Sequence, residues 1–202
     1  EGKVIVADAP QTDSSFDKIV EVLALDQIKE FYLDQDLDFE LIDLRQEEWK
    51  TQDGVVTSKK SLHGDPNGNV SFDLGDCSEF VGHNGGGRYY GADYDAQEVN
   101  RHHRDGRHEY LVAASAIKSD VIFNLPKLKT HKKAGITVSL KNLVGVTADK
   151  NWLPHHTEGG FLSEGDEHPD PGILHKTERA ALPILRRLST SVPHIGPWIH
   201  RR

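Results

Sequence analysis

Basic side chains are concentrated between residues 126 and 142 of this 202-residue chain. Four lysines and one histidine stand together near the start of that segment: Lys127, Lys129, His131, Lys132 and Lys133. An ammonium group binds phosphate or carboxylate as a point charge, and an imidazole titrates near neutrality. The combination predicts a site for a small anion, in which Lys127 and Lys129 hold the ligand and His131 acts as general acid or base.

The residues that follow extend this predicted site. Apolar positions recur nearly all round the segment 135–144, which predicts a buried helix. Lys141 and Asn142 lie inside it, and Thr137 shares a helical face with Lys141. Since a buried lysine is costly unless it is paired or near an anion, Lys141 is expected to contact the ligand as a second catalytic group, with Thr137 and Asn142 orienting the substrate. The alternative is that Lys141 reaches solvent or pairs with a core carboxylate.

A glycine-rich loop, residues 84–88, offers a second contact for an anion through Arg88. It lacks the preceding strand, the following helix and the Lys-Ser/Thr ending of a phosphate-binding P-loop. A flexible connector is the competing interpretation of this loop.

Adjacent histidines occur as a pair at two places in the sequence and suggest a divalent metal. Neither pair has the spacing of a known metal motif. The candidate set is His131 with His155 or His156 and a carboxylate such as Asp8. The competing interpretation is that these histidines lie in solvated loops. The sequence leaves the cofactor unknown, with a divalent metal as the one candidate.

The elements that would position these residues follow an order of strand, basic loop and helix. Residues 121–125 are predicted as a buried strand, and anions collect at the carboxyl ends of strands and at helix starts. Residues 4–7 and 39–44 are predicted to join it in one sheet, with helices at 13–23 and 26–34 between them. The predicted fold is α/β: an open, at least partly parallel sheet with flanking helices and long irregular loops.

The rest of the chain is predicted in less detail. Residues 55–62 and 69–74 are expected to form a hairpin, and residues 109–118 a helix. Residues 78–107 and 147–172 are expected to be long mobile loops. Residues 176–202 are predicted as a C-terminal helix and tail of a single α/β domain that spans residues 1–202.

Composition limits the class of protein. The chain lacks methionine and starts directly in an apolar run, which indicates a fragment of a longer protein. No apolar run approaches the roughly 20 residues of a membrane span, so no membrane partner is expected. One cysteine, Cys77, excludes an internal four-cysteine iron–sulfur cluster and favours a cytoplasmic location.

Charge is distributed unevenly along the chain. Residues 1–100 contain eight Lys and Arg against 22 Asp and Glu, whereas residues 101–202 contain 16 against 10. Ten of the twelve histidines also lie in the second half. The basic half therefore favours an anionic partner, and ordinary solvated surface is the alternative.

The segment 119–145 resembles the most recognisable stretch of the domain of unknown function 362 family, through Ser119-Asp-Val-Ile-Phe-Asn-Leu-Pro-Lys-Leu-Lys-Thr-His131 and Ile136-Thr-Val-Ser-Leu-Lys-Asn-Leu-Val-Gly145. His155 or His156 resembles the downstream histidine of that family, and the likeness extends over residues 1–160. The resemblance implies a partner that contains an iron–sulfur module, since some members are fused to one. It implies no reaction.

These observations favour an enzyme domain of unknown reaction that binds a small phosphorylated or carboxylated metabolite. One alternative is a non-catalytic binding or redox-partner domain that works with a separate iron–sulfur protein. The second is single-stranded nucleic acid binding, with Tyr89, Tyr90 and Tyr94 stacking on bases. The acidic first half would repel a long polyanion, which makes nucleic acid the less favoured partner.

Overall fold

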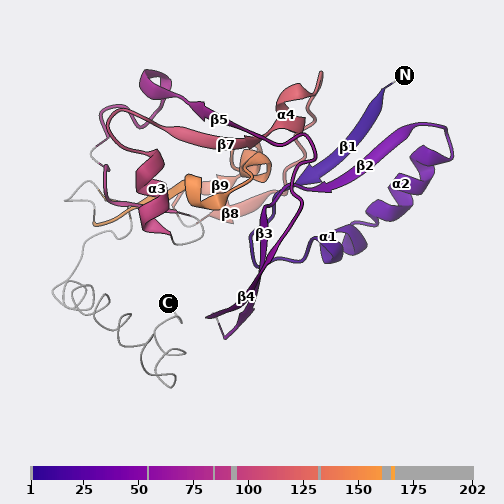
Figure 1. The fold of residues 1–202 in the computed structure, drawn as a ribbon, viewed down its shortest axis with the longest axis horizontal. Helices are drawn as coiled ribbons and strands as arrows, with labels where there is room; N and C mark the ends of the chain where they lie inside the picture. Colours follow the sequence, from indigo (N-terminus) through magenta and orange to yellow (C-terminus); the bar gives the residue numbers. More distant parts are fainter. Residues whose placement is uncertain are drawn as a thin grey trace. The chain divides into compact units, whose positions relative to one another are not determined.

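The computed structural model describes residues 2–53, 55–83, 85–91, 95–131, 133–160 and 165–166. Short helices and short strands are mixed along these residues, so the fold is α/β, as predicted (Figure 1). Contacts divide the chain into two compact units, each assembled from separated segments. The first unit contains Glu1–Glu48, Lys60–Asp73 and Glu109–Lys150. The second contains Trp49–Lys59, Leu74–His108 and the chain from Asn151 onward.

A parallel strand pair begins the first unit. Strand β1, Lys3–Asp8, pairs with β2, Asp38–Asp43, in a register that runs from Lys3 opposite Asp38 to Asp8 opposite Asp43. Helices α1, Phe16–Val22, and α2, Leu25–Leu33, form the crossover between them (Figure 1). This βαβ unit confirms the predicted strands at 4–7 and 39–44 and the two predicted helices, because parallel strands require such a crossover.

The core of the first unit lies at the carboxyl end of this pair. Ala9, Ile42, Leu44 and Ala113 are buried together, and Ile5 packs against them. Ala9 and Leu44 directly follow β1 and β2, and Ile42 is next to the last residue of β2, so the buried core lies close to the carboxyl ends of these strands.

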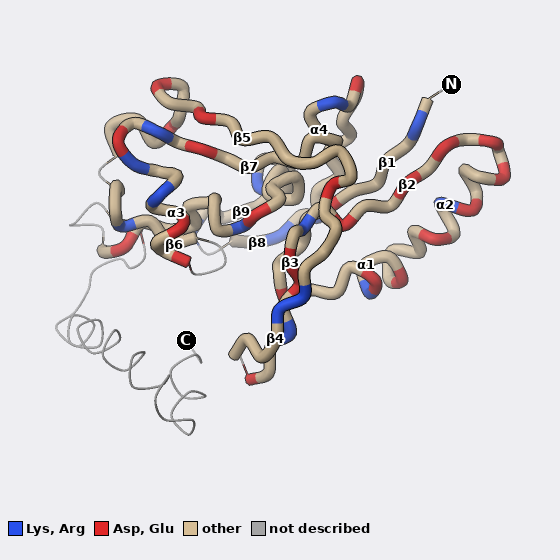
Figure 2. Tube along the Cα trace, viewed as in Figure 1, with Lys and Arg blue, Asp and Glu red and all other residues tan. Residues whose placement is uncertain are grey.

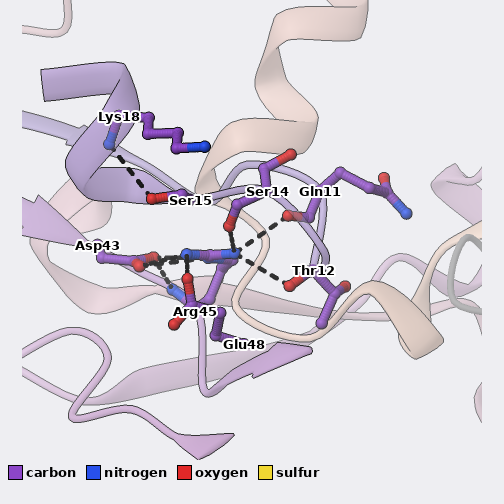
Figure 3. Close-up of polar contacts among 8 residues, drawn as sticks. All are labelled: Gln11, Thr12, Ser14, Ser15, Lys18, Asp43, Arg45 and Glu48. Atoms are coloured by element: carbon purple, nitrogen blue, oxygen red, sulfur yellow. Dashed lines mark hydrogen bonds and ion pairs between the residues drawn. The ribbon is translucent and has the colours of Figure 1, made fainter. Parts of the chain in front are cut away.

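A buried arginine closes the loop after β1 onto the end of β2 (Figure 3). The guanidinium of Arg45 donates to both carboxylate oxygens of Asp43, with Nη2 at 2.7 Å from Oδ2. Its Nη1 also donates to the carbonyls of Gln11, Thr12 and Ser14, at 3.1, 3.2 and 2.7 Å. Arg45 is only 2% exposed, so these bonds supply partners that water no longer provides.

The hairpin predicted from residues 55–62 and 69–74 is wrong. Strand β4, Val55–Ser61, pairs with β3, Glu47–Gln52, whereas β5, Asn69–Asp73, pairs antiparallel with β7, Glu109–Ala113. The cause lies in the connecting turn, where buried Asp65 accepts hydrogen bonds from the amide and hydroxyl of Ser115. That anchor ties the turn to the chain after β7 instead of to a neighbouring hairpin.

The helix predicted over residues 109–118 is half correct. Its first half is strand β7, and only Ala114–Lys118 is helical, as α4. Tyr110, Leu111 and Val112 are large or β-branched residues that suit a strand, and β5 offers them a ladder.

The segment after α4 departs most from the sequence prediction. Residues 121–125 form no strand within the described chain, and most of their side chains are exposed. The buried helix predicted at 135–144 is replaced by a hairpin of β8, Lys129–His131, and β9, Gly135–Thr137, followed by α5, Ser139–Asn142, and the 3-10 turn η2, Leu143–Val146. Gly135 has φ of +73°, a left-handed conformation that ends the turn and lets β-branched Ile136 and Thr137 pair with β8.

The second unit has structure where long irregular loops were predicted. Strand β6, Tyr89–Gly91, pairs antiparallel with β10, Pro154–Thr157, and helix α3, Ala96–His102, lies beside β6. Two 3-10 turns, η1 at Gly75–Cys77 and η3 at Lys150–Trp152, complete the described elements. Asp95 caps α3 by accepting from the amides of Gln97 and Glu98, a cap signal that the loop prediction overlooked.

Two remaining predictions concern the ends and the exterior of the chain. The C-terminal helix and tail predicted at 176–202 lie outside the described residues, and the single-domain prediction stays a prediction. Among the described helices, none has the length and apolar character needed to cross a bilayer.

Candidate functional site

The hairpin of β8 and β9 places three of the predicted site residues on one face. Lys129 lies opposite Thr137 in the antiparallel register, and His131 is two residues along the same strand. Side chains two apart on a strand, and directly opposite across a pair, point to the same side. Lys129, His131 and Thr137 therefore share one face of the hairpin, although the predicted helix would have arranged them differently.

The turn of the hairpin fixes the imidazole of His131. Its Nδ1 accepts hydrogen bonds from the backbone amides of Lys133 and Ala134, each at 3.2 Å. An atom that accepts two N–H groups has no proton of its own, so the proton of the neutral ring is on Nε2. The ring thus presents an N–H donor on the side away from the turn.

The side chain of Lys141 lies next to the Nε2 atom of His131. Its ammonium Nζ lies 3.4 Å from His131 Nε2, and both side chains belong to the first unit. An ammonium group has donors only. Two donors this close have no acceptor between them, and an anionic oxygen placed there would accept from both. The Lys141–His131 pair therefore stays a predicted site for an anion, in line with the sequence prediction.

The other predicted ligands of this site take different positions. Lys127 is exposed on the segment that leads into β8. The side-chain amide of Asn142 donates to Asn124 Oδ1 at 2.8 Å, and Asn124 donates in turn to the Ser139 carbonyl at 2.9 Å. Asn142 therefore ties α5 to the extended segment before β8, and its Nδ2 already has an acceptor.

Arg88 and the histidine pair belong to the second unit. The Nη1 of Arg88 donates to the Glu158 carbonyl at 3.0 Å. The rings of His155 and His156, on β10, lie 4.2 Å apart. Within the described residues, no three His, Cys, Asp or Glu side chains gather closely enough to hold a metal ion. The metal set of His131 with His155 or His156 stays a prediction.

A polar cluster at the carboxyl end of β1 was missed in the sequence. Burial raises the pKa of the Asp8 carboxyl, and the positive charge of Lys150 opposes that rise. Lys150 is itself 4% exposed, and its Nζ donates to the carbonyls of Val144 and Thr147 at 2.6 and 3.2 Å. Lys150 thus holds η2, the turn that directly follows α5. The one available signal was the position of Asp8 at the end of an apolar run.

Gly145 brings this cluster against the segment of the candidate site. Its carbonyl accepts from the Ala9 amide at 2.6 Å, and a Cβ at this position would collide with Asp8 Oδ1. A larger residue at this position would force the Asp8 carboxylate to turn away. The segment that contains Lys141 therefore ends at the carboxyl end of β1. The sequence prediction had instead placed the site at the carboxyl end of a strand at 121–125.

A second missed feature is a buried histidine pair in the second unit. His103 Nε2 donates to the Trp152 carbonyl at 2.8 Å, which leaves His103 Nδ1 as an acceptor in the neutral ring. His108 Nδ1 lies 3.3 Å from it and supplies the proton. The pair satisfies its own hydrogen bonds, which indicates a structural role. Tyr89, one of the predicted base-stacking residues, is 2% exposed beside it, so that stacking prediction is wrong for Tyr89.

Comparisons with known proteins agree with the resemblance seen in the sequence. The family described as "Domain of unknown function (DUF362)" matches residues 76–188. The "Thylakoid-associated protein sll1697" of Synechocystis sp. is 32% identical over 92 residues, which make up 46% of this chain and 27% of that protein. The chain thus matches about a quarter of the length of this relative. No solved structure matches the chain.

Proposed function

Because the chain belongs to the DUF362 family of domains of unknown function, we propose its function from the site itself: it binds a small phosphorylated or carboxylated metabolite between Lys141 and His131. The observation that supports this proposal is the approach of two nitrogen donors to 3.4 Å with His131 Nδ1 already occupied by two amides. An oxygen anion is the partner that both donors require.

The neighbouring groups favour an anion of more than one oxygen. Lys129 and Thr137 are on the hairpin face that carries His131, and Lys127 precedes them along the chain. A phosphate or carboxylate held at Lys141 leaves further oxygens for these side chains. We propose that Lys127 and Lys129 contribute charge and that Thr137 orients the ligand.

His131 is the proposed proton-transfer group, with Lys141 beside it. A proton added at Nδ1 would break the two bonds from the turn amides, and Nε2 is the nitrogen that faces the ligand. In the neutral ring Nε2 only donates a hydrogen bond, because loss of its proton would leave an imidazolate. Proton transfer therefore requires that Nδ1 first release the turn amides and take a proton. The resulting imidazolium can protonate a leaving oxygen through Nε2, and the Nδ1–H ring that remains can accept a proton from the substrate at Nε2. We propose on this basis an enzyme domain that transfers a proton to or from an anionic substrate.

We place this activity in the cytoplasm. Cys77 is exposed and unbonded to another cysteine, as expected of a chain that works in a reducing compartment.

Calorimetry with phosphate, sulfate and citrate tests the proposal. Lys141→Met keeps most of the side-chain volume and removes one donor. It should weaken binding of the best anion by about tenfold or more, since a hydrogen bond to a charged group contributes roughly 1.5–3 kcal/mol.

The matched control is Lys118→Met, which removes an exposed lysine at the end of α4. It should change the dissociation constant by less than about twofold, as expected of a screened surface charge. Equal binding by the parent and Lys141→Met would show that the site is elsewhere.

A further inference from the structure

The segment around the anion site exposes large apolar side chains to an unusual degree. Phe123, Leu125 and Leu140 are 83%, 84% and 86% exposed. Their exposed apolar neighbours are Val121, Ile122, Leu128, Ile136, Val138 and Leu143. Folded proteins seldom leave so many apolar side chains together in water without a binding partner.

Hydrogen bonds hold the extended segment around Asn124 beside α5. Asn124 donates to the Ser139 carbonyl and accepts from Asn142, so the extended segment runs alongside α5. Asn124 is half-buried by these bonds, while Phe123 and Leu125 on either side of it are exposed. Phe123 and Leu125 alternate with Asn124 and therefore point away from α5, while Leu140 is exposed on α5 itself. Exposed apolar side chains thus stand on two segments that lie side by side. Residues 121–143 are called the apolar–basic surface below.

The charge of this surface has one sign. Between Ser119 and Gly145 the sequence contains five lysines and a single acidic residue, Asp120. Figure 2 shows lysine at β8, while Asp and Glu are concentrated along α1, α2 and β2 of the same unit. An anionic partner would thus be attracted to one side of the unit and repelled by the other.

We propose that the apolar–basic surface docks on an anionic lipid bilayer. Phe123, Leu125 and Leu140 enter the headgroup boundary, and the lysines face lipid phosphates. Leucine and phenylalanine interleaved with lysine is the composition of segments that lie in a bilayer interface. Docking of this kind needs no membrane-spanning helix. The sequence prediction of no membrane partner rested on the lack of such a helix, so it does not address a contact at the bilayer surface.

Two other occupants fit the chemistry less well. A second copy of the chain would bring the same lysines against one another, because a two-fold interface pairs identical patches. A protein partner would have to bury lysines, which are depleted from the cores of protein interfaces.

Vesicle cosedimentation with the full chain tests this proposal. Binding is expected to vesicles of phosphatidylcholine mixed with phosphatidylglycerol, to weaken as salt is raised, and to be at least tenfold weaker to phosphatidylcholine alone. The double variant Phe123→Ser/Leu125→Ser removes exposed side chains and should lower binding to the mixed vesicles at least tenfold. Phe31→Ser, which changes an exposed aromatic on α2, should bind like the parent.

The outcomes separate this inference from the small-anion site. Phe123→Ser/Leu125→Ser should leave calorimetric phosphate binding unchanged. Absence of binding to the mixed vesicles, or equal binding by the double variant, would overturn the bilayer proposal. So would a dimer in analytical ultracentrifugation that the double variant abolishes. Vesicle binding by a protein that binds no phosphate, sulfate or citrate would support the bilayer surface and overturn only the small-anion site.

Discussion

The chemistry of the candidate site depends on which nitrogen of the His131 ring holds the proton. His131 receives two amide N–H groups at Nδ1 and therefore directs its own N–H toward Lys141. The two amides belong to Lys133 and Ala134, in the turn that ends at Gly135. The local backbone, more than any distant contact, decides which nitrogen faces Lys141.

The tautomer of His131 is the first testable consequence. In protein labelled with ¹⁵N, long-range proton–nitrogen spectra above the titration range of histidine should show the Nε2–H form for this ring. Binding of phosphate should shift Nε2 more than Nδ1. A spectrum of the Nδ1–H form would contradict the assignment, because Nε2 would then accept from Lys141 and need no anion.

The carboxyl of Asp8 gives a prediction of pH dependence. Its pKa is raised in the folded state, chiefly by burial. Ionisation therefore costs the folded state more than the unfolded state, and the loss of stability grows as pH rises through the folded pKa. Asp8→Asn removes the ionisation and keeps an oxygen acceptor.

Urea unfolding at several pH values measures this effect. The parent should lose stability relative to Asp8→Asn as the pH rises from below about 3.9, the ordinary pKa of aspartate. A stability difference that is the same at every pH would show that Asp8 ionises freely.

At the scale of elements, local patterns predicted some structures and not others. The βαβ unit was predictable because apolar strands 4–7 and 39–44 flank two helical segments, the first of which has a side-chain cap at Ser15. Residues 121–125 have the apolar, β-branched composition of a buried strand, yet they are exposed in the described structure. The composition of a segment indicates which secondary structure it prefers. Whether the segment is buried depends on which other surface is available to cover it.

The anchors between elements were the other features that sequence reasoning overlooked. Asp65 and Arg45 each bind groups far away in the chain, and neither stands in a recognisable motif. Their effects decide which strand β5 pairs with and how the loop after β1 closes. Such long-range hydrogen bonds leave no periodic signal in a single sequence.

Arg45 gives a prediction at this scale. Arg45→Ala removes the partner of Asp43 and the donor to three loop carbonyls, and should lower the free energy of unfolding by about 3 kcal/mol or more. Arg101→Ala is the control, because Arg101 also pairs with a carboxylate, Glu98, but is 64% exposed. It should cost less than about 1 kcal/mol. Denaturation curves in which the two variants match would show that the network around Arg45 adds little.

At the scale of the whole molecule, the family match and the candidate site overlap in part. The match covers residues 76–188, which includes Lys127, His131 and Lys141, but excludes the β1–β2 pair. The sequence predicted which segment contains the candidate site, and it predicted that Lys141 lies close to His131. It did not predict the hairpin that joins them, because the apolar pattern of 135–144 suits a helix as well as a strand followed by a short turn.

Three of the other candidate site residues belong to a different unit from Lys141 and His131. Arg88, His155 and His156 belong to the second unit, and each has contacts within it. The redox-partner alternative and the metal set therefore stay predictions. The proposed function rests on the first unit, and within it on the side chains of Lys141 and His131.

Crystals soaked in selenate would test that pair most directly, because selenium gives an anomalous signal that locates the anion. The account predicts a peak whose oxygens lie about 2.7–3.0 Å from both Lys141 Nζ and His131 Nε2, with further oxygens toward Lys129 or Thr137. Crystals of Lys141→Met, soaked in the same way, should lose this peak. Selenate bound only at other positions, or a Lys141 side chain turned to bulk water away from His131, would contradict the account.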